Sequence, residues 1–308
     1  MFRWRVSCTA ALLVCATLLA AQDVIRVNVN LVHVTATVKN ASGALVGNLK
    51  KEDFEIFDNG VRQEIALLQR QTEQPLSVAL LIDTSGSTAK DLKYETDSAA
   101  RFLHALLAEG HPEDAVALYS FNYDVNEGRF THNYRSLETA LKTLHGEAGT
   151  ALYDAIFFAS RALEPRDGRK AMVVITDGGD TISRHNLKQA LEAAQLADAV
   201  IYPIVVLPIT NDAGRNIGGE NALTFMAEGT GGRTFFMPAP SPQLDHVLTD
   251  IISELRTQYL LGFYPRGVPL TKERFHKLEV RTVSRELRVS ARNGYYGEAV
   301  GAAGTPKR

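Results

Sequence analysis

Two hydrophobic patterns share the 308 residues of this chain. From Val24 to Leu68, apolar residues tend to occupy every second position, which is typical of strands with one buried face, and the segments after residue 258 are strand-like again. Between these flanks, short continuous apolar runs alternate with segments whose apolar residues recur at helical spacing. The pattern predicts a central α/β region between two β flanks.

The central region is expected to form a doubly wound, mostly parallel sheet, because strand and helix signals alternate along it. Strands are expected near residues 78–83, 115–121, 171–176, 200–206 and 233–236, and helices near 89–108, 135–144, 152–163, 185–197, 219–228 and 241–257. Gly229, Gly231 and Gly232 precede the last of these strands. We expect them to serve backbone geometry rather than phosphate binding.

The flanks carry strong turn signals. Asp58-Asn59-Gly60 between two alternating segments predicts a β-hairpin, and turn chemistry rather than calcium binding explains Asp53, Asp58 and Asn59. After residue 258, three further strand-like segments follow. Because the two flanks together have the strand count of a small immunoglobulin-like sandwich, we expect them to pair as an antiparallel β-sandwich. Independent β extensions at the two ends are the alternative.

The first 21 residues have the features of a secretory signal peptide. Arg3 and Arg5 precede an apolar stretch from Cys8 to Leu19, and Ala20-Ala21 offers a cleavage point. Both cysteines lie in this segment, so the mature chain would contain no disulfide, which favours a bacterial exported protein in the periplasm, the envelope or the medium. Retention of the segment as a membrane anchor is the alternative.

The predicted organisation is a signal peptide at 1–21, a split Ig-like β domain at 22–74 and 259–298, the α/β domain at 75–258, and a disordered tail at 299–308. The formal net charge is only −2, and no basic block or stripe of Lys and Arg between aromatic residues occurs. Nucleic acid is therefore not an expected partner.

The candidate chemistry lies where predicted strands end. Asp83, Ser85 and Ser87 form a D-x-S-x-S directly after the first central strand, Thr150 opens a predicted helix, and Asp177 follows another strand. In parallel α/β sheets, ligands bind outside the carboxyl ends of the strands. A carboxylate and neutral hydroxyls suit Mg²⁺, Mn²⁺ or Ca²⁺ better than zinc or copper. The sequence therefore predicts a divalent-cation site at this edge.

These segments resemble the metal-ion-dependent adhesion site of the von Willebrand factor A (VWA) domain. The first segment matches the family's D-x-S-x-S, Thr150 matches its threonine, and Asp177 matches the aspartate of its T-D-G segment. In the family, the protein leaves one coordination place open, and a Glu or Asp of a partner often fills it. The resemblance implies a VWA fold over residues 75–258 and a binding module that captures a partner's carboxylate through a cation, with Mg²⁺ first and Mn²⁺ or Ca²⁺ as alternatives.

Other functions stay open beside this one. An envelope scaffold with a vestigial site is one alternative, and a metal-assisted hydrolase is another, although the sequence offers no recognisable general base. We expect no enzyme activity and no small-molecule substrate, and a membrane as partner only if the signal segment is retained. The signal segment, the Val27–Val34 start and the Gln258–Tyr264 segment most resemble the VWA-related exported proteins of acidobacteria.

Neighbouring residues have plainer interpretations. Thr150 could simply cap its helix. Asp154 is expected to be an acid in the first helical turn. Asp180 could reach the metal through a water molecule, but it is expected to cap a helix or hold its loop. His185 is expected to be a solvated loop or helix-end residue. The segment from Tyr123 to Glu127 is expected to be a loop at the same edge of the sheet as the cation.

Overall fold

The computed structural model describes residues 31–70, 74–86, 92–108, 110–207, 215–238, 243–268 and 274–297, which belong to one compact unit. The predicted signal peptide and the predicted tail lie outside these residues. Among the helices that the structure describes, none is long and apolar enough to cross a membrane.

The central sheet has the strand order β10-β9-β8-β5-β6-β7. Its strands are β5 (Leu76–Asp83), β6 (Ala115–Phe121), β7 (Val125–Glu127), β8 (Arg169–Thr176), β9 (Val200–Leu207) and β10 (Phe235–Pro238). All pairings are parallel except that of β7 with β6. Every residue of β5 and β6 is buried, which explains why these strands appear in the sequence as continuous apolar runs.

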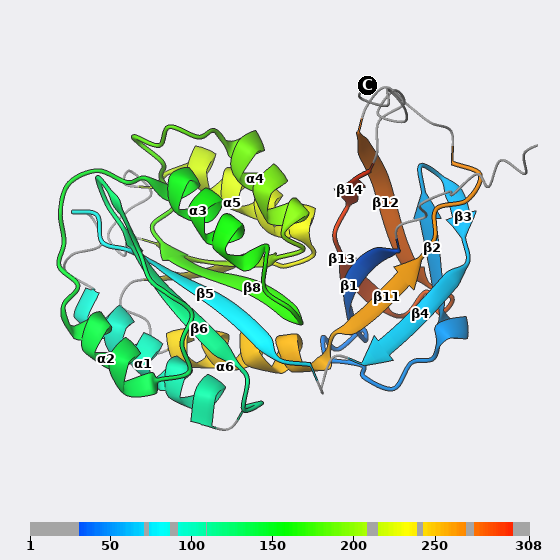
Figure 1. Ribbon diagram of the computed structural model, residues 1–308, viewed down its shortest axis with the longest axis horizontal. Helices are drawn as coiled ribbons and strands as arrows, with labels where there is room; N and C mark the ends of the chain where they lie inside the picture. Colours follow the sequence, from blue (N-terminus) through cyan, green and yellow to red (C-terminus); the bar gives the residue numbers. More distant parts are fainter. Residues whose placement is uncertain are drawn as a thin grey trace, which may run out of the picture. The chain divides into compact units, whose positions relative to one another are not determined.

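Helices cover both faces of this sheet (Figure 1). They are α1 (Leu92–Ala108), α2 (Tyr134–Lys142), α3 (Leu152–Leu163), α4 (Leu187–Leu196), α5 (Ile217–Thr230) and α6 (Gln243–Thr257). Val78, Leu80 and Ile82 pack in a core with α1, α2 and α6. Ala79 and Leu81 point the other way, into a core with α3, α4 and α5. The doubly wound architecture predicted from the sequence is therefore present.

Asparagine side chains fix where several helices begin. Asn133 accepts a hydrogen bond from Ser136 N at the start of α2, and Asn216 accepts one from Gly219 N at the start of α5. Asn186 forms a reciprocal capping box with Gln189 at the start of α4. These side chains satisfy backbone N–H groups that have no partner inside the helix, so the loops before the helices are fixed locally.

The flanks form two further sheets, with orders β13-β1-β11-β4 and β14-β12-β2-β3. Their elements are β1 (Val32–Lys39), the 3-10 helix η1 (Lys51–Asp53), β2 (Phe54–Asp58), β3 (Val61–Gln63), β4 (Ile65–Arg70), β11 (Tyr259–Phe263), β12 (Phe275–Thr282), β13 (Arg288–Ala291) and β14 (Gly294–Tyr296). Strand β1 pairs antiparallel with β11 and β13, and β2 pairs with β12. The strands of the two flanks thus share both sheets, and a common core contains residues of both.

One expectation about a short segment was wrong, and another was incomplete. Val125–Glu127 is not loop but the edge strand β7, which pairs with Tyr119–Phe121. Asp58 is more than a turn residue, because its buried carboxylate accepts hydrogen bonds from Tyr295 Oη (2.6 Å) and His276 Nδ1 (3.1 Å). The hairpin itself is confirmed, since Asn59 and Gly60 have the positive φ angles of 47° and 82° that a tight hairpin turn requires.

Candidate functional site

The candidate site lies at the carboxyl ends of β5 and β8, which are neighbours in the sheet. Ile82 pairs with Ile175, so the next residues, Asp83 and Thr176, stand side by side where the strands end. The parallel arrangement therefore brings the D-x-S-x-S segment and the T-D-G segment to one edge.

Asp83 is fully buried and held in place by its neighbours. Its Oδ1 accepts a hydrogen bond from Ser85 N (2.8 Å), and its Oδ2 accepts one from Thr176 Oγ1 (2.6 Å). The pKa of Asp83 is raised to about 6, mainly by burial; the hydrogen bond from Thr176 lowers it, the charge of Asp177 raises it, and the hydrogen bonds from Ser85 lower it. Asp83 and Asp177 are thus close enough for their charges to repel, which a cation between them would relieve.

Thr150 reaches the same edge on a loop that precedes α3. Its N–H donates to Thr181 Oγ1 (2.9 Å), and its carbonyl accepts from Thr181 N (2.9 Å). The residue is buried, yet its hydroxyl hydrogen-bonds none of the residues that the structure describes. The helix cap is Ala151 rather than Thr150, so the capping interpretation of Thr150 was wrong.

Asp177 and Asp180 take different parts in their loop. The Asp177 carboxylate is partly exposed and forms no hydrogen bond or ion pair within the described residues, which leaves its oxygens available to a ligand. Asp180 Oδ1 accepts from Tyr153 N (3.1 Å) at the start of α3 and from Ser183 Oγ (2.5 Å). The structure therefore assigns Asp180 to holding the loop, as expected.

The serines of the D-x-S-x-S segment are only partly described. Ser85 is buried and forms a parallel β-bridge with Glu147, beside a hydrogen bond from Glu147 N to Thr84 O (2.9 Å). This bridge ties the loop before Thr150 to the end of β5. Ser87 lies outside the described residues, so its predicted role stays a prediction.

The residues present fit a hard divalent cation. Asp83 and Asp177 offer carboxylate oxygens, and Ser85 and Thr150 offer hydroxyl oxygens, with no sulfur or imidazole among them. Among described residues, no three His, Cys, Asp or Glu side chains gather as a metal cluster. The donor set at this edge is of a different composition, because it combines two carboxylates with hydroxyls.

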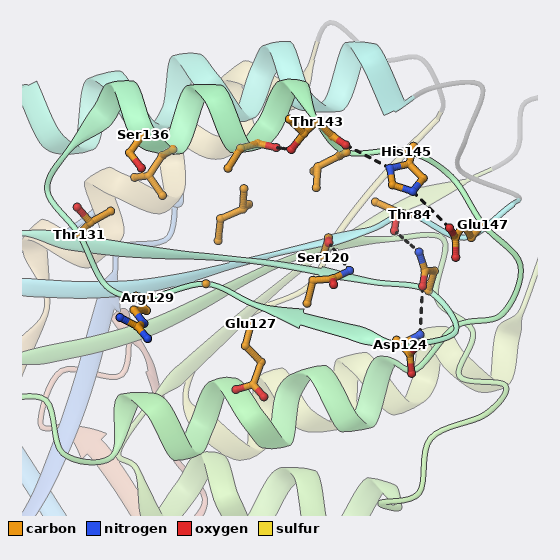
Figure 2. Close-up of a pocket in the computed structure, with 17 residues that line it drawn as sticks. Thr84, Ser120, Asp124, Glu127, Arg129, Thr131, Ser136, Thr143, His145 and Glu147 are labelled. Atoms are coloured by element: carbon orange, nitrogen blue, oxygen red, sulfur yellow. Dashed lines mark hydrogen bonds and ion pairs between the residues drawn. The ribbon is translucent and has the colours of Figure 1, made fainter.

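A polar cavity of about 740 Å³ adjoins this edge. Thr84 lines it, and so do Glu147, Ser120 of β6, and Ser136 of α2. Figure 2 shows these side chains arriving from strand, loop and helix around the hollow. A partner that reached the predicted cation would therefore find hydroxyl and carboxylate groups beside it.

Exposed apolar side chains stand on segments beside the candidate ligands. Tyr123 is 67% exposed, Ile182 38% and Ile217 61%. A Cβ on Gly149 would lie 3.0 Å from Ile182 Cδ1 and 3.3 Å from Tyr123 Cα, so these two loops meet beside Thr150. Ile217 begins α5, whose first turn lies against the Gly178 backbone. Large exposed apolar side chains grouped in this way mark interaction surfaces.

Sequence reasoning missed a tether behind the site. Asp154 accepts hydrogen bonds from Arg184 N (3.0 Å), His185 N (2.9 Å) and His185 Nδ1 (2.7 Å). The His185 ring stacks on Phe157 at 3.8 Å between centroids, so it is not the solvated residue that we expected. The only signal in the sequence was an acid in a first helical turn, which does not indicate a partner thirty residues later.

The central domain is similar to known proteins. Residues 78–179, from β5 to the loop after β8, match the family model of the von Willebrand factor type A domain. A search of curated proteins found no match. Among solved structures, the von Willebrand factor type A protein from Catenulispora acidiphila superposes with a TM-score of 0.50 and 11% identity, over 82% of this chain and 76% of that one.

Two further solved structures are similar at lower TM-scores. The conserved hypothetical protein BatB from Bacteroides thetaiotaomicron gives 0.46 with 22% identity, over 58% of this chain and 98% of that one. The pilus adhesin SpaC from Lactobacillus rhamnosus GG, in its open conformation, gives a TM-score of 0.49 with 10% identity, over 80% of this chain and 47% of that one. Residues 78–179 thus resemble a von Willebrand factor type A domain, and the Catenulispora structure shows that the chain shares the fold of that protein.

Proposed function

We propose that this VWA domain is a divalent-cation-dependent protein-binding module of an exported protein, which captures a Glu or Asp carboxylate of a partner. The proposed ligands are Asp83, Ser85, Ser87, Thr150 and Asp177, and Mg²⁺ is the first candidate ion. The observation that carries the proposal is the convergence of two carboxylates and two hydroxyls at one sheet edge, with the Asp177 carboxylate and the Thr150 hydroxyl unpaired within the described residues.

The residues around the proposed cation site have different roles in binding. Thr176 and the Ser85 backbone orient the Asp83 carboxylate through the two hydrogen bonds described above. Thr181 and Asp180 hold the loops that carry Thr150 and Asp177. A bound cation would supply an electrophilic coordination place for an incoming carboxylate. Tyr123, Ile182 and Ile217 would give that partner apolar contact around the ion.

The same proposal makes the module a binding protein rather than an enzyme. Its partner is a protein, and no nucleic acid or small-molecule substrate is involved. The export depends on the predicted signal peptide, and the narrower resemblance to acidobacterial exported proteins stays a prediction.

The test is titration of the purified protein with Mg²⁺ and Mn²⁺ by isothermal calorimetry, with a carboxylate peptide as partner mimic. Wild type should bind the ion, and Asp83→Ala should bind it at least about a hundredfold more weakly, because it loses the buried charged ligand. Binding by Asp83→Ala at the wild-type level would refute the proposed ligand set.

Asp83→Ala removes two buried hydrogen bonds and could unfold the loop, so a second variant is needed. Thr150→Val keeps the side-chain shape and removes a hydroxyl that bonds no described residue. Its thermal stability should therefore equal that of wild type while ion affinity falls. Asp124→Asn, an exposed carboxylate beside the polar cavity, is the matched control and should leave ion binding unchanged.

A further inference from the structure

A second cavity lies at the opposite ends of the parallel strands from the candidate cation site. It has a volume of about 280 Å³. Its lining includes Arg169 and Lys170 at the start of β8, and Val200 at the start of β9. His33 of β1 and Leu260 of β11 also line it, so both the central domain and the flanking sheets contribute. None of these residues belongs to the proposed cation site.

The charges around this cavity are unbalanced. The cationic side chains are Arg166, Arg169, Lys170 and Arg292, against the carboxylates Asp167 and Asp198. Arg292 Nη1 pairs with Asp198 Oδ1 at 2.5 Å, which uses one carboxylate. Three cationic groups and the exposed Asp167 then remain, which leaves an excess of positive charge.

The three remaining cations hydrogen-bond only to neutral groups. Arg166 Nε donates to Ser77 Oγ (3.0 Å), and Lys170 Nζ donates to Glu164 O (2.9 Å). Arg169 donates to the carbonyls of Gln74 and Leu255. Within the described residues, none of the three forms an ion pair with a carboxylate. Burial lowers the pKa of Arg169 to about 10 and lowers the pKa of Lys170 as well. The charges of Asp114 near Arg169 and of Asp198 near Lys170 only partly offset this effect of burial.

Arg292 adds a buried donor. Its Nη2 donates to His33 O, and its Nη1 donates to Asp198 Oδ1. Its Nε is buried and has no hydrogen-bond partner in the part of the chain that the structure describes. A buried donor without an acceptor is costly and rare in folded proteins, so this Nε adds to the uncompensated positive charge behind the cavity wall.

We propose that this cavity binds a small oxyanion of the phosphate or sulfate type, with Arg166 and Lys170 as its donors. Guanidinium and ammonium groups form their strongest hydrogen bonds with such anions. The volume lies near the lower end of the range of about 300–1,000 Å³ for ligand pockets, which suits a single ion or a small ester. Because the lining comes from β1, β11 and the central domain, the bound anion also stabilises the contact between them.

The test is calorimetric titration of the full protein with inorganic phosphate at constant ionic strength set by sodium chloride. Lys170→Gln and Arg166→Gln are the variants, and Lys188→Gln, an exposed lysine on α4 outside this cavity, is the control with the same change of charge. Wild type and Lys188→Gln should bind with equal affinity. Each cavity variant should bind roughly tenfold to a hundredfold more weakly, the effect of one charge-assisted hydrogen bond.

Glycerol 3-phosphate is titrated in parallel to distinguish a free ion from an ester. Tighter binding of inorganic phosphate assigns the site to the free ion, and tighter binding of the ester assigns it to a phosphoryl group on a small molecule. Absence of saturable binding to wild type, or equal weakening in Lys188→Gln, would overturn the proposal. Cation binding at the other edge is measured separately and does not depend on this outcome.

Discussion

The tether between Asp154 and the loop after β8 makes a quantitative prediction. In the Asp154→Asn variant, the side chain keeps one acceptor oxygen but turns an amide N–H₂ toward a backbone N–H that now has no acceptor. Wild-type Asp154 accepts from Arg184 N, His185 N and His185 Nδ1, and its side chain is only 11% exposed. Losing at least one hydrogen bond to a charged group, and leaving a donor unpaired, should cost about 2–3 kcal/mol of unfolding free energy at pH 7.

The cost should depend on pH with a definite sign. Burial raises the pKa of Asp154, but the hydrogen bonds from Arg184 and His185 lower it more, so its pKa lies below the ordinary value. A carboxyl with a depressed pKa contributes stability that is fully present above about pH 4, the unfolded value, and is lost as the pH falls through the folded pKa. The difference between wild type and Asp154→Asn should therefore be constant near neutrality and shrink below about pH 4.

Urea unfolding of both proteins, followed by circular dichroism from pH 7 downward, measures this difference. Asp124→Asn is a matched control, because that carboxylate is exposed and forms no ion pair with a described residue, and it should change stability by less than about 0.5 kcal/mol. An Asp154→Asn variant as stable as wild type at pH 7 would refute the tether. A deficit that does not shrink in acid would refute the role of its charge.

Two further substitutions test the backbone and the flanking sheets. Gly231→Ala should lose about 1–3 kcal/mol of unfolding free energy, because φ is +88° and the new Cβ would lie 2.8 Å from Arg292 N. Gly218→Ala is the control in thermal unfolding and should be near neutral, because the atom nearest to its new Cβ is 3.6 Å away. Tyr295→Phe should lose about 1–3 kcal/mol in urea, because the buried Asp58 loses a 2.6 Å hydrogen bond. The exposed Tyr264→Phe is its control, and equal stability of the two would contradict this reasoning.

Burial explains which elements could be predicted from the sequence. The expected strand at 115–121 and helix at 152–163 coincide with β6 and α3. Every residue of β6 is buried, so the strand is a continuous apolar run, and α3 has one buried face, so its apolar residues recur at helical spacing. Strand β7 was not predicted, since a segment of three residues with a single apolar side chain is too short to show the alternation of a strand. Pairing of the flanks was predictable because neither flank has enough strands to enclose a core alone.

The candidate cation site was predictable for a different reason. Its residues follow strand ends directly, and parallel strands bring their carboxyl ends to one edge independently of the conformation of the loops. The contacts of Asp154 with His185 have no such rule, because they depend on how a loop folds back over a helix. Short sequence motifs therefore predicted the proposed ligands, but not the residues that hold them.

The oxyanion cavity extends this contrast between the two ends of the sheet. Its cationic residues are spread from Arg166 to Arg292, with no motif and no basic block, and the whole chain has a formal charge of only −2. Only folding brings these four cationic side chains around one hollow, where two carboxylates balance them only in part. Positive charge gathers at the amino ends of the strands, whereas the carboxylates of Asp83 and Asp177 lie at the carboxyl ends. One end of the sheet therefore favours anions, and the other favours cations. A cation-dependent partner and a small anion would then bind without competing, so each can be removed by mutation while the other is measured.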